Sequence, residues 1–79
     1  MARIVRNDHL YTQVTDAIRE DIANEVYKPG DALPSETRMI EQYGVSRTTL
    51  RQALVILRHA GLIEVRHGKG SFVRKEFVK

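Results

Sequence analysis

The stretch SETRMIEQYGVSRTTLRQAL, at residues 35–54, contains two helical segments on either side of a glycine. Ser35 can accept a hydrogen bond from a backbone amide of the first turn, so it predicts the start of a helix that continues to Tyr43. Gly44 suits the left-handed conformation just past a helix end. Ser46 is placed to cap the next helix. Two helices joined by a turn of about three residues with glycine in it form a helix-turn-helix.

The second of these helices is expected at about residues 46–60 and has one apolar side. Its apolar residues fall at the i, i+3, i+4 and i+7 spacing of a buried stripe, which comprises Leu50, Ala53, Leu54 and Leu57. Its first turn combines arginines with hydroxyl groups and an amide, and contains no acidic residue. An arginine fork can bind guanine, glutamine can bind adenine, and threonine offers thymine a hydrogen bond and a methyl contact. The candidate DNA-binding residues of this helix are Arg47, Thr48, Thr49, Arg51 and Gln52.

An ordinary solvated helix face is the alternative interpretation of these polar residues. Their position favours DNA, because the second helix of a helix-turn-helix is the one that enters the major groove.

A first helix is predicted upstream from apolar residues at three- and four-residue spacing, which are Leu10, Val14, Ile18, Ile22 and Val26. Asn7 or Asp8 is expected to cap it. It should end before residues 28–31, where proline and glycine predict a turn.

Downstream, residues 62–66 and 71–74 are rich in β-branched and aromatic side chains and predict a hairpin. Its tip, with Arg66, His67 and Lys69 around Gly68, is basic and could lie over phosphates or in the minor groove. A tight turn that happens to be basic is the alternative. Three helices followed by a C-terminal β-hairpin wing define the expected fold class, an α+β winged helix-turn-helix.

Charge is unevenly distributed along the 79 residues, a length that fits one small domain. Residues 1–43 carry five basic and eight acidic side chains, for a net charge of −3. Residues 44–75 carry seven basic side chains and one acidic side chain, for a net charge of +6. Positive charge concentrated in this way suits a polyanionic partner.

Catalysis, metal binding and membrane insertion find no support in the sequence. There is no cysteine, and the three histidines are not at metal-ligand spacing. No serine has a histidine and an acid placed to activate it, so neither an enzyme nor a cofactor is expected. No apolar run approaches the ~18 residues of a membrane span, and the first residues lack a signal peptide. We therefore expect a cytoplasmic protein.

Four motifs occur in order along the chain: YKPGDALPSE at 27–36, YGVSRTTLRQAL at 43–54, GLI at 61–63 and HGKGSFV at 67–73. Together they closely resemble the DNA-binding domain of GntR-family bacterial transcription regulators, over about residues 10–73. The resemblance implies a winged helix that binds double-stranded DNA at palindromic operators as a homodimer and acts as a repressor.

The resemblance also implies a domain organisation. Residues 1–9 would form an N-terminal arm, residues 10–75 the DNA-binding domain, and residues 76–79 the start of a linker. Family members continue into a C-terminal domain that binds a small-molecule effector and supplies most dimer contacts. The domain alone, with a thin core and no long self-complementary stripe, should be monomeric.

Residue roles are carried over from the family motif. DNA contacts are implied for Arg47, Thr48, Thr49, Arg51, for Ser46 at the helix start, and for His67 and Gly68 in the minor groove. Many members place an arginine directly after the Ser-Glu pair, whereas here Thr37 follows and Arg38 comes next. The candidate contacts of that helix are therefore Ser35, Thr37 and Arg38.

Two further features are compared with the family pattern. A glycine common before the Pro-Gly turn is Glu25 here, which predicts that the first helix runs longer. The wing and the start of the first helix at residues 11–14 resemble the HutC-like branch.

The alternative function is a winged helix used for protein interaction. Its contact surface would be the acidic face of the first helix, or Val55 and Ile56.

Overall fold

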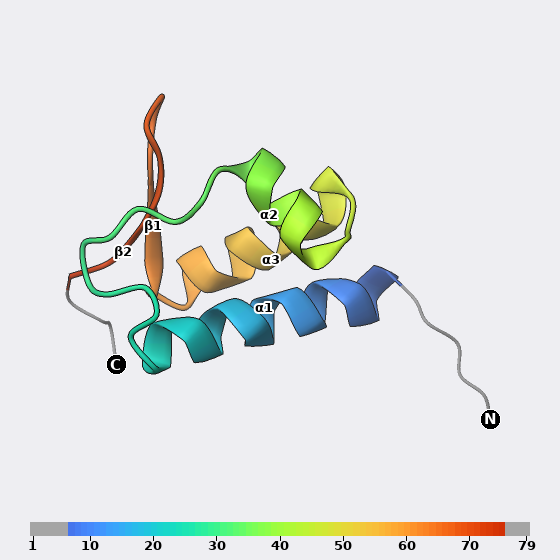
Figure 1. Cartoon of the computed structure of the whole chain (residues 1–79), viewed down its shortest axis with the longest axis horizontal. Helices are drawn as coiled ribbons and strands as arrows, with labels where there is room; N and C mark the ends of the chain where they lie inside the picture. The colour runs from blue at the N-terminus through green and yellow to red at the C-terminus, as the bar shows by residue number, and fades with distance from the viewer. Residues whose placement is uncertain (1–6, 76–79) are drawn as a thin grey trace.

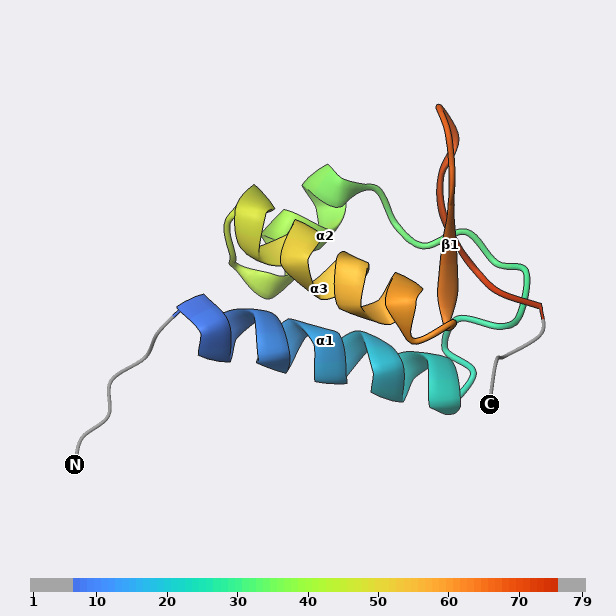
Figure 2. The ribbon, with the colours of Figure 1, turned by 180° about the vertical axis from the view of Figure 1, so that it is seen from behind.

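The computed structural model describes residues 7–75, with side chains from Leu10 onward. Its elements are, in order, α1 (Asn7–Ala23), α2 (Glu36–Tyr43), α3 (Arg47–His59), β1 (Ile63–Arg66) and β2 (Gly70–Val73). α1 lies along α3, α2 packs against α3, and the hairpin of β1 and β2 stands away from the helices (Figure 1; Figure 2). The predicted winged helix-turn-helix is confirmed.

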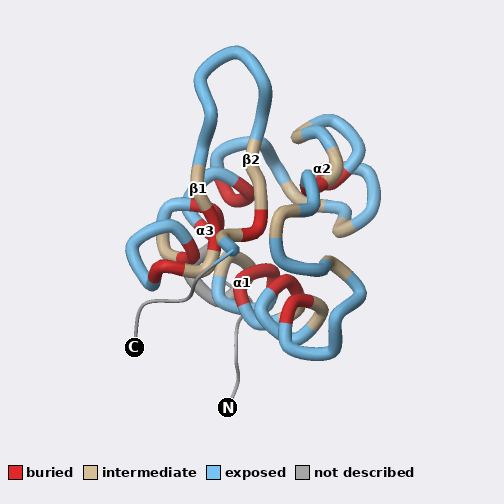
Figure 3. The backbone as a smooth tube through the Cα atoms, turned by 90° about the vertical axis from the view of Figure 1, so that its left-hand side faces the viewer, coloured by how far each residue is buried: buried red, intermediate tan, exposed pale blue. Residues whose placement is uncertain are grey.

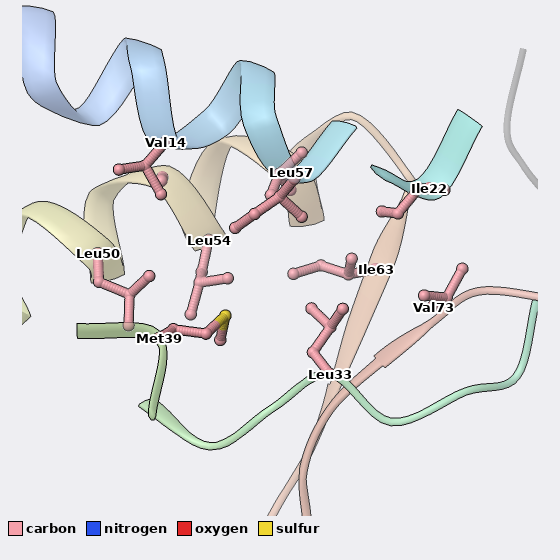
Figure 4. Packing of buried hydrophobic residues seen from close by; sticks show 11 residues of the cluster. Val14, Ile22, Leu33, Met39, Leu50, Leu54, Leu57, Ile63 and Val73 are labelled. Atoms are coloured by element: carbon pink, nitrogen blue, oxygen red, sulfur yellow. The ribbon is translucent and has the colours of Figure 1, made fainter. Parts of the chain in front are cut away.

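One hydrophobic core joins the helices to the base of the hairpin. Figure 4 shows side chains from all three helices converging on Leu33 and on Ile63 of β1. The predicted stripe of α3 is confirmed, because its four apolar residues are all buried. The buried apolar residues are Val14, Ile18, Ile22, Leu33, Met39, Leu50, Ala53, Leu54, Leu57, Ile63 and Val73.

The two ends of α1 differ from the sequence prediction. The helix begins at Asn7, so residues 7–9 belong to it rather than to an arm, and Asn7 and Asp8 lie within its first turn. The remaining arm residues and the predicted linker at 76–79 lie outside the described residues.

At its other end α1 stops at Ala23, so the prediction of a longer helix is wrong. Glu25 adopts a left-handed conformation with φ 61°. The amide of Val26 donates to the carbonyl of Asp21 at 2.8 Å, and the amide of Glu25 donates to that of Ile22 at 3.1 Å. This pair of bonds is the Schellman motif, in which the left-handed position is usually glycine. The chain therefore turns away, and Val26, predicted to be buried, is 61% exposed.

The helix-turn-helix forms as the capping residues predict. Ser35 Oγ accepts from the amide of Arg38 at 3.2 Å, and Ser46 Oγ accepts from the amide of Thr49 at 3.1 Å. Gly44, between the helices, has φ 67° and donates its amide to the carbonyl of Ile40 at 2.9 Å. These caps fix the start of α3 relative to α2.

The wing is an antiparallel pair in which Ile63 faces Val73 and Arg66 faces Gly70. The segment at residues 30–33 runs beside β2, an association that the sequence did not reveal. The amide of Leu33 donates to the carbonyl of Ser71 at 2.9 Å, and the amide of Val73 donates to that of Asp31 at 2.8 Å. The base of the wing is thus tied to the segment that leads into α2, while its tip is exposed (Figure 3).

Candidate DNA-binding interface

The outward face of α3 carries most of the predicted DNA-binding side chains. Arg47, Thr48, Arg51 and Gln52 are all exposed. They are held there because the opposite side of the helix is buried against α1 and α2. The helix therefore presents two arginines, a hydroxyl and an amide on the surface that a recognition helix would place in the major groove.

Thr49 is the exception among the candidate residues of α3, because it is buried rather than exposed on this face. The residue is 3% exposed. Its Oγ1 accepts a hydrogen bond from Ser46 Oγ at 3.0 Å, while its amide is capped by the same oxygen. Thr49 lies beside the buried stripe, and its hydrogen bonds with Ser46 stabilise the start of α3.

The candidate residues of α2 are less closely grouped with this surface. Ser35, Thr37 and Arg38 are exposed. Ser35 uses its hydroxyl oxygen to cap α2, and it lies beside the wing. Thr37 and Arg38 line neither of the two grooves that border α3.

An ion cluster connects α2 to the arginines of α3, and we call Glu36, Arg47 and Arg51 the Glu36 cluster. Glu36 Oε1 accepts from Arg47 Nη1 at 2.8 Å. Arg51 donates Nε to both carboxylate oxygens at 3.2 Å and Nη2 to Oε1 at 3.1 Å. The hydrogen bond from Arg51, with help from that of Arg47 and the two positive charges, lowers the pKa of Glu36 against the opposing effect of burial. The cluster therefore carries a net charge of +1 at neutral pH.

The wing presents a third arginine held by an acid. Arg66 donates Nε to Glu64 Oε2 at 2.9 Å, and its guanidinium lies 4.3 Å from the centre of the Phe72 ring. His67, Gly68 and Lys69 form the loop between the strands, where Gly68 has φ 75° and all three residues are exposed. The predicted tip is thus basic and exposed, and Gly68 adopts the left-handed conformation in its turn.

A groove of about 630 Å³ separates the wing from α2 and α3, and we call it the wing groove. It brings together Ser35, Arg51, Arg66, His67, Gly68 and Lys69 of the predicted residues. Arg58 also lines it. The sequence analysis did not single out Arg58, although it lies two turns after Arg51 on the same helix and on the same side.

A second, open groove of about 450 Å³ runs along α3 and contains Thr48, Arg51 and Gln52. Tyr11 of α1 borders it, and nothing in the sequence marked this tyrosine as part of the interface. Arg51 lines both grooves, so it stands where the face of α3 meets the wing groove.

Among the described residues, no group of three or more histidine or acidic side chains could hold a metal ion. Tyr43 Oη is buried without a hydrogen-bond partner among the described residues, and burial, followed by nearby Tyr27 and Asp21, raises its pKa to about 12. It is therefore neutral at physiological pH. Between residues 7 and 75, no helix has the length and apolar character needed to cross a bilayer.

The fold and this basic surface define a DNA-binding domain of the winged helix-turn-helix class rather than an enzyme. Residues 10–73 match the model of the family described as "Bacterial regulatory proteins, gntR family". The chain belongs to this family.

Three relatives illustrate the similarity. The Mannosyl-D-glycerate transport/metabolism system repressor MngR of Escherichia coli (strain K12) is 48% identical over 69 residues, which are 87% of this chain and 29% of MngR. The uncharacterized HTH-type transcriptional regulator Rv0494 of Mycobacterium tuberculosis (strain ATCC 25618 / H37Rv) is 47% identical over 68 residues, 86% of this chain and 26% of that protein. The crystal structure of AraR(DBD) in complex with operator ORR3 has a TM-score of 0.80 at 32% identity and covers 92% of this chain and 84% of that one.

The chain thus spans between a quarter and a third of the length of these two curated relatives.

Proposed function

We propose that this chain is the sequence-specific DNA-binding domain of a bacterial transcription regulator, with α3 in the major groove. The tip of the wing, residues 66–70, would contact the minor groove or the phosphates beside it. The observation that carries the proposal is the position of Arg51, at the junction between the exposed face of α3 and the basic wing groove. A structural relative, AraR(DBD), is described in complex with an operator, which supports the same partner here.

The finer parts of the proposal follow the family. MngR is named a repressor, and we propose repression here too, at a palindromic operator and in the cytoplasm, where the chromosome lies. We also propose that the full-length protein is a homodimer with a C-terminal effector domain, and that it belongs to the HutC-like branch. The sequence of the full gene would show whether a C-terminal domain follows and whether the protein belongs to the HutC-like branch.

The proposal is tested by selecting duplexes bound by this chain from a random pool. We expect the monomeric chain to enrich a half-site, and the chain fused to a dimerising domain to enrich a palindrome whose half-sites lie about one helical turn apart, because two joined copies then share one face of the DNA. The logarithm of affinity should fall with the logarithm of salt concentration by about 0.9 for each phosphate neutralised. Failure to enrich any duplex at the lowest salt would refute the proposal.

The same salt series distinguishes the alternative, a protein-interaction module. Val55 is 42% exposed and lies in both grooves, so it is the apolar contact that such a module would use. An apolar protein contact depends little on salt, whereas the charged residues around Val55 favour a polyanion. DNA is therefore the partner that the surface fits best.

The oligomeric state gives a further test. We expect the isolated chain to sediment as a monomer without DNA and to bind its operator weakly. Fusion to a dimerising domain should tighten binding strongly, because tethering raises the effective concentration of the second copy to the millimolar range. A stable dimer of the chain alone at low micromolar concentration would contradict this expectation.

A further inference from the structure

The Glu36 cluster places one carboxylate between two arginines that a DNA-binding surface needs. Glu36 comes from α2, whereas Arg47 and Arg51 lie one turn apart on α3. A carboxylate at this place repels phosphate, so attraction to DNA does not account for it. Its hydrogen bonds to the two arginines indicate a different role.

Each guanidinium gives Glu36 one edge and keeps another. Arg51 donates Nε and Nη2, which is its side edge, and Nη1 makes no hydrogen bond within the described residues. Its end edge, formed by Nη1 and the second hydrogen of Nη2, remains open. Arg47 donates Nη1 and keeps the edge formed by Nε and Nη2. Guanine needs one such two-donor edge for its O6 and N7.

The cluster also limits how freely these arginines move. Three hydrogen bonds from Arg51 and one from Arg47 fix both planar groups on a carboxylate whose side chain is 35% exposed. The side chains of Arg47 and Arg51 are themselves 49% and 61% exposed, so both remain accessible to a partner. An arginine fixed before binding loses less conformational freedom when it forms a hydrogen bond than one that is mobile.

We propose that Glu36 is a positioning residue that determines base specificity, by holding Arg51 so that its end edge reads guanine while reducing general attraction to phosphate. The inference rests on the proposed binding of DNA. It assigns Glu36 a role in discrimination between sequences, with no contact to a base of its own.

The test compares binding to two duplexes, one enriched from a random pool by the wild-type chain and one scrambled duplex of the same composition. Glu36→Gln keeps the size of the side chain and removes its charge. We expect the ratio of the two Kd values to fall about fivefold or more, which is the smaller end of what a bidentate base contact supplies. Most of the fall should come from tighter binding to the scrambled duplex.

A charge-matched control separates geometry from electrostatics. Glu41 is exposed on the same helix and has no ion pair among the described residues, so Glu41→Gln makes the same change in net charge. It should tighten both complexes alike and leave the ratio unchanged. Glu36→Asp keeps the charge but shortens the side chain, so it should lower the ratio while leaving the salt dependence near that of the wild type. Circular dichroism checks that each variant is folded.

The role of Arg51 is tested by combining variants. Arg51→Ala should lose most of the same discrimination. In the Arg47→Ala/Arg51→Ala background, adding Glu36→Gln should cause no further loss, because the carboxylate acts only through the arginines that it holds. Replacing the guanine that Arg51→Ala identifies by 7-deazaguanine should weaken the wild-type complex more than the Glu36→Gln complex.

Three results would overturn the inference. If Glu36→Gln shifts both Kd values equally, as Glu41→Gln does, the carboxylate is only a local charge. If its loss of discrimination persists in the Arg47→Ala/Arg51→Ala background, where Glu36 has no arginine left to hold, Glu36 reads a base directly, as a carboxylate can with cytosine. If the wild-type chain enriches no duplex at all, the proposed function fails and the inference with it, which is a distinguishable outcome.

Discussion

Glu25, which follows α1 in a left-handed conformation, is a position where substitution by glycine should stabilise the fold rather than destabilise it. Glu25 has φ 61° and makes no hydrogen bond or ion pair through its side chain among the described residues. A residue with a Cβ in this conformation costs about 1–2 kcal/mol. Glycine would remove that cost but would add about 0.5–1 kcal/mol of flexibility to the unfolded chain. Glu25→Gly should therefore raise the free energy of unfolding by about 0.5–1 kcal/mol.

Thermal unfolding followed by circular dichroism measures the effect. For a domain of this size 1 kcal/mol corresponds to about 4–8 °C in Tm, so we expect an increase of about 2–8 °C. Glu25→Ala, which keeps the strain, should change Tm little. Glu20→Gly lies within α1 and should lower stability by about 1 kcal/mol. If Glu25→Gly lowered Tm as Glu20→Gly does, residue 25 would be part of a continuing helix and the assignment of the left-handed turn would be wrong.

Three other predictions follow from the core and the interface. Leu57→Ala removes a fully buried side chain and should cost about 2–5 kcal/mol in urea unfolding, whereas Val55→Ala, at an exposed position on the same helix, should cost far less. Arg47→Ala should weaken binding to the enriched duplex by about 1–3 kcal/mol more than binding to a scrambled one. Lys69→Ala should weaken binding to both duplexes alike and make the dependence of affinity on salt shallower. The opposite result would mean that Lys69 reads a base and Arg47 contacts phosphate. The hydrogen bonds from Arg51 and Arg47 lower the pKa of Glu36 below its ordinary value of 4.5. The ionised carboxylate therefore stabilises the folded domain fully above pH 4.5, and this stabilisation is lost as the pH falls through the lowered pKa. The stability difference between the wild type and Glu36→Gln should therefore shrink below pH 4.5, and a difference that stays constant would show that the ion cluster adds nothing.

Local sequence signals predicted the elements of this fold well. Ser35 and Ser46 each cap a helix, and Gly44 takes the left-handed position between them, because these effects need only a few neighbouring residues. The apolar spacing of α3 likewise predicted its buried side. Such features depend on the chain within one or two turns, so a single sequence is enough to find them.

Features that depend on tertiary contacts were missed or wrongly predicted. The hydrogen bonds of Leu33 and Val73 join segments about forty residues apart, and nothing local marks either one. Helical spacing places Thr49 at the edge of the buried stripe, where small shifts in packing decide exposure, so the spacing alone does not predict that it is buried. Val26 continued the apolar pattern of α1, but the left-handed turn at Glu25 carried it outside.

The charge pattern was predicted as two halves of opposite sign, and the structure shows why that division is incomplete. α1 buries one side against α3, and its described acidic residues, Asp16, Glu20 and Asp21, line neither of the two grooves that border α3. Glu36 and Glu64 lie within the basic surface itself, and each is bonded to arginines proposed to contact DNA. A surface of this kind gives up part of its general attraction to phosphate and gains fixed directions for its guanidinium groups. Weak binding of one domain to random DNA follows, and discrimination then depends on fixed arginines and on the pairing of two domains at one operator.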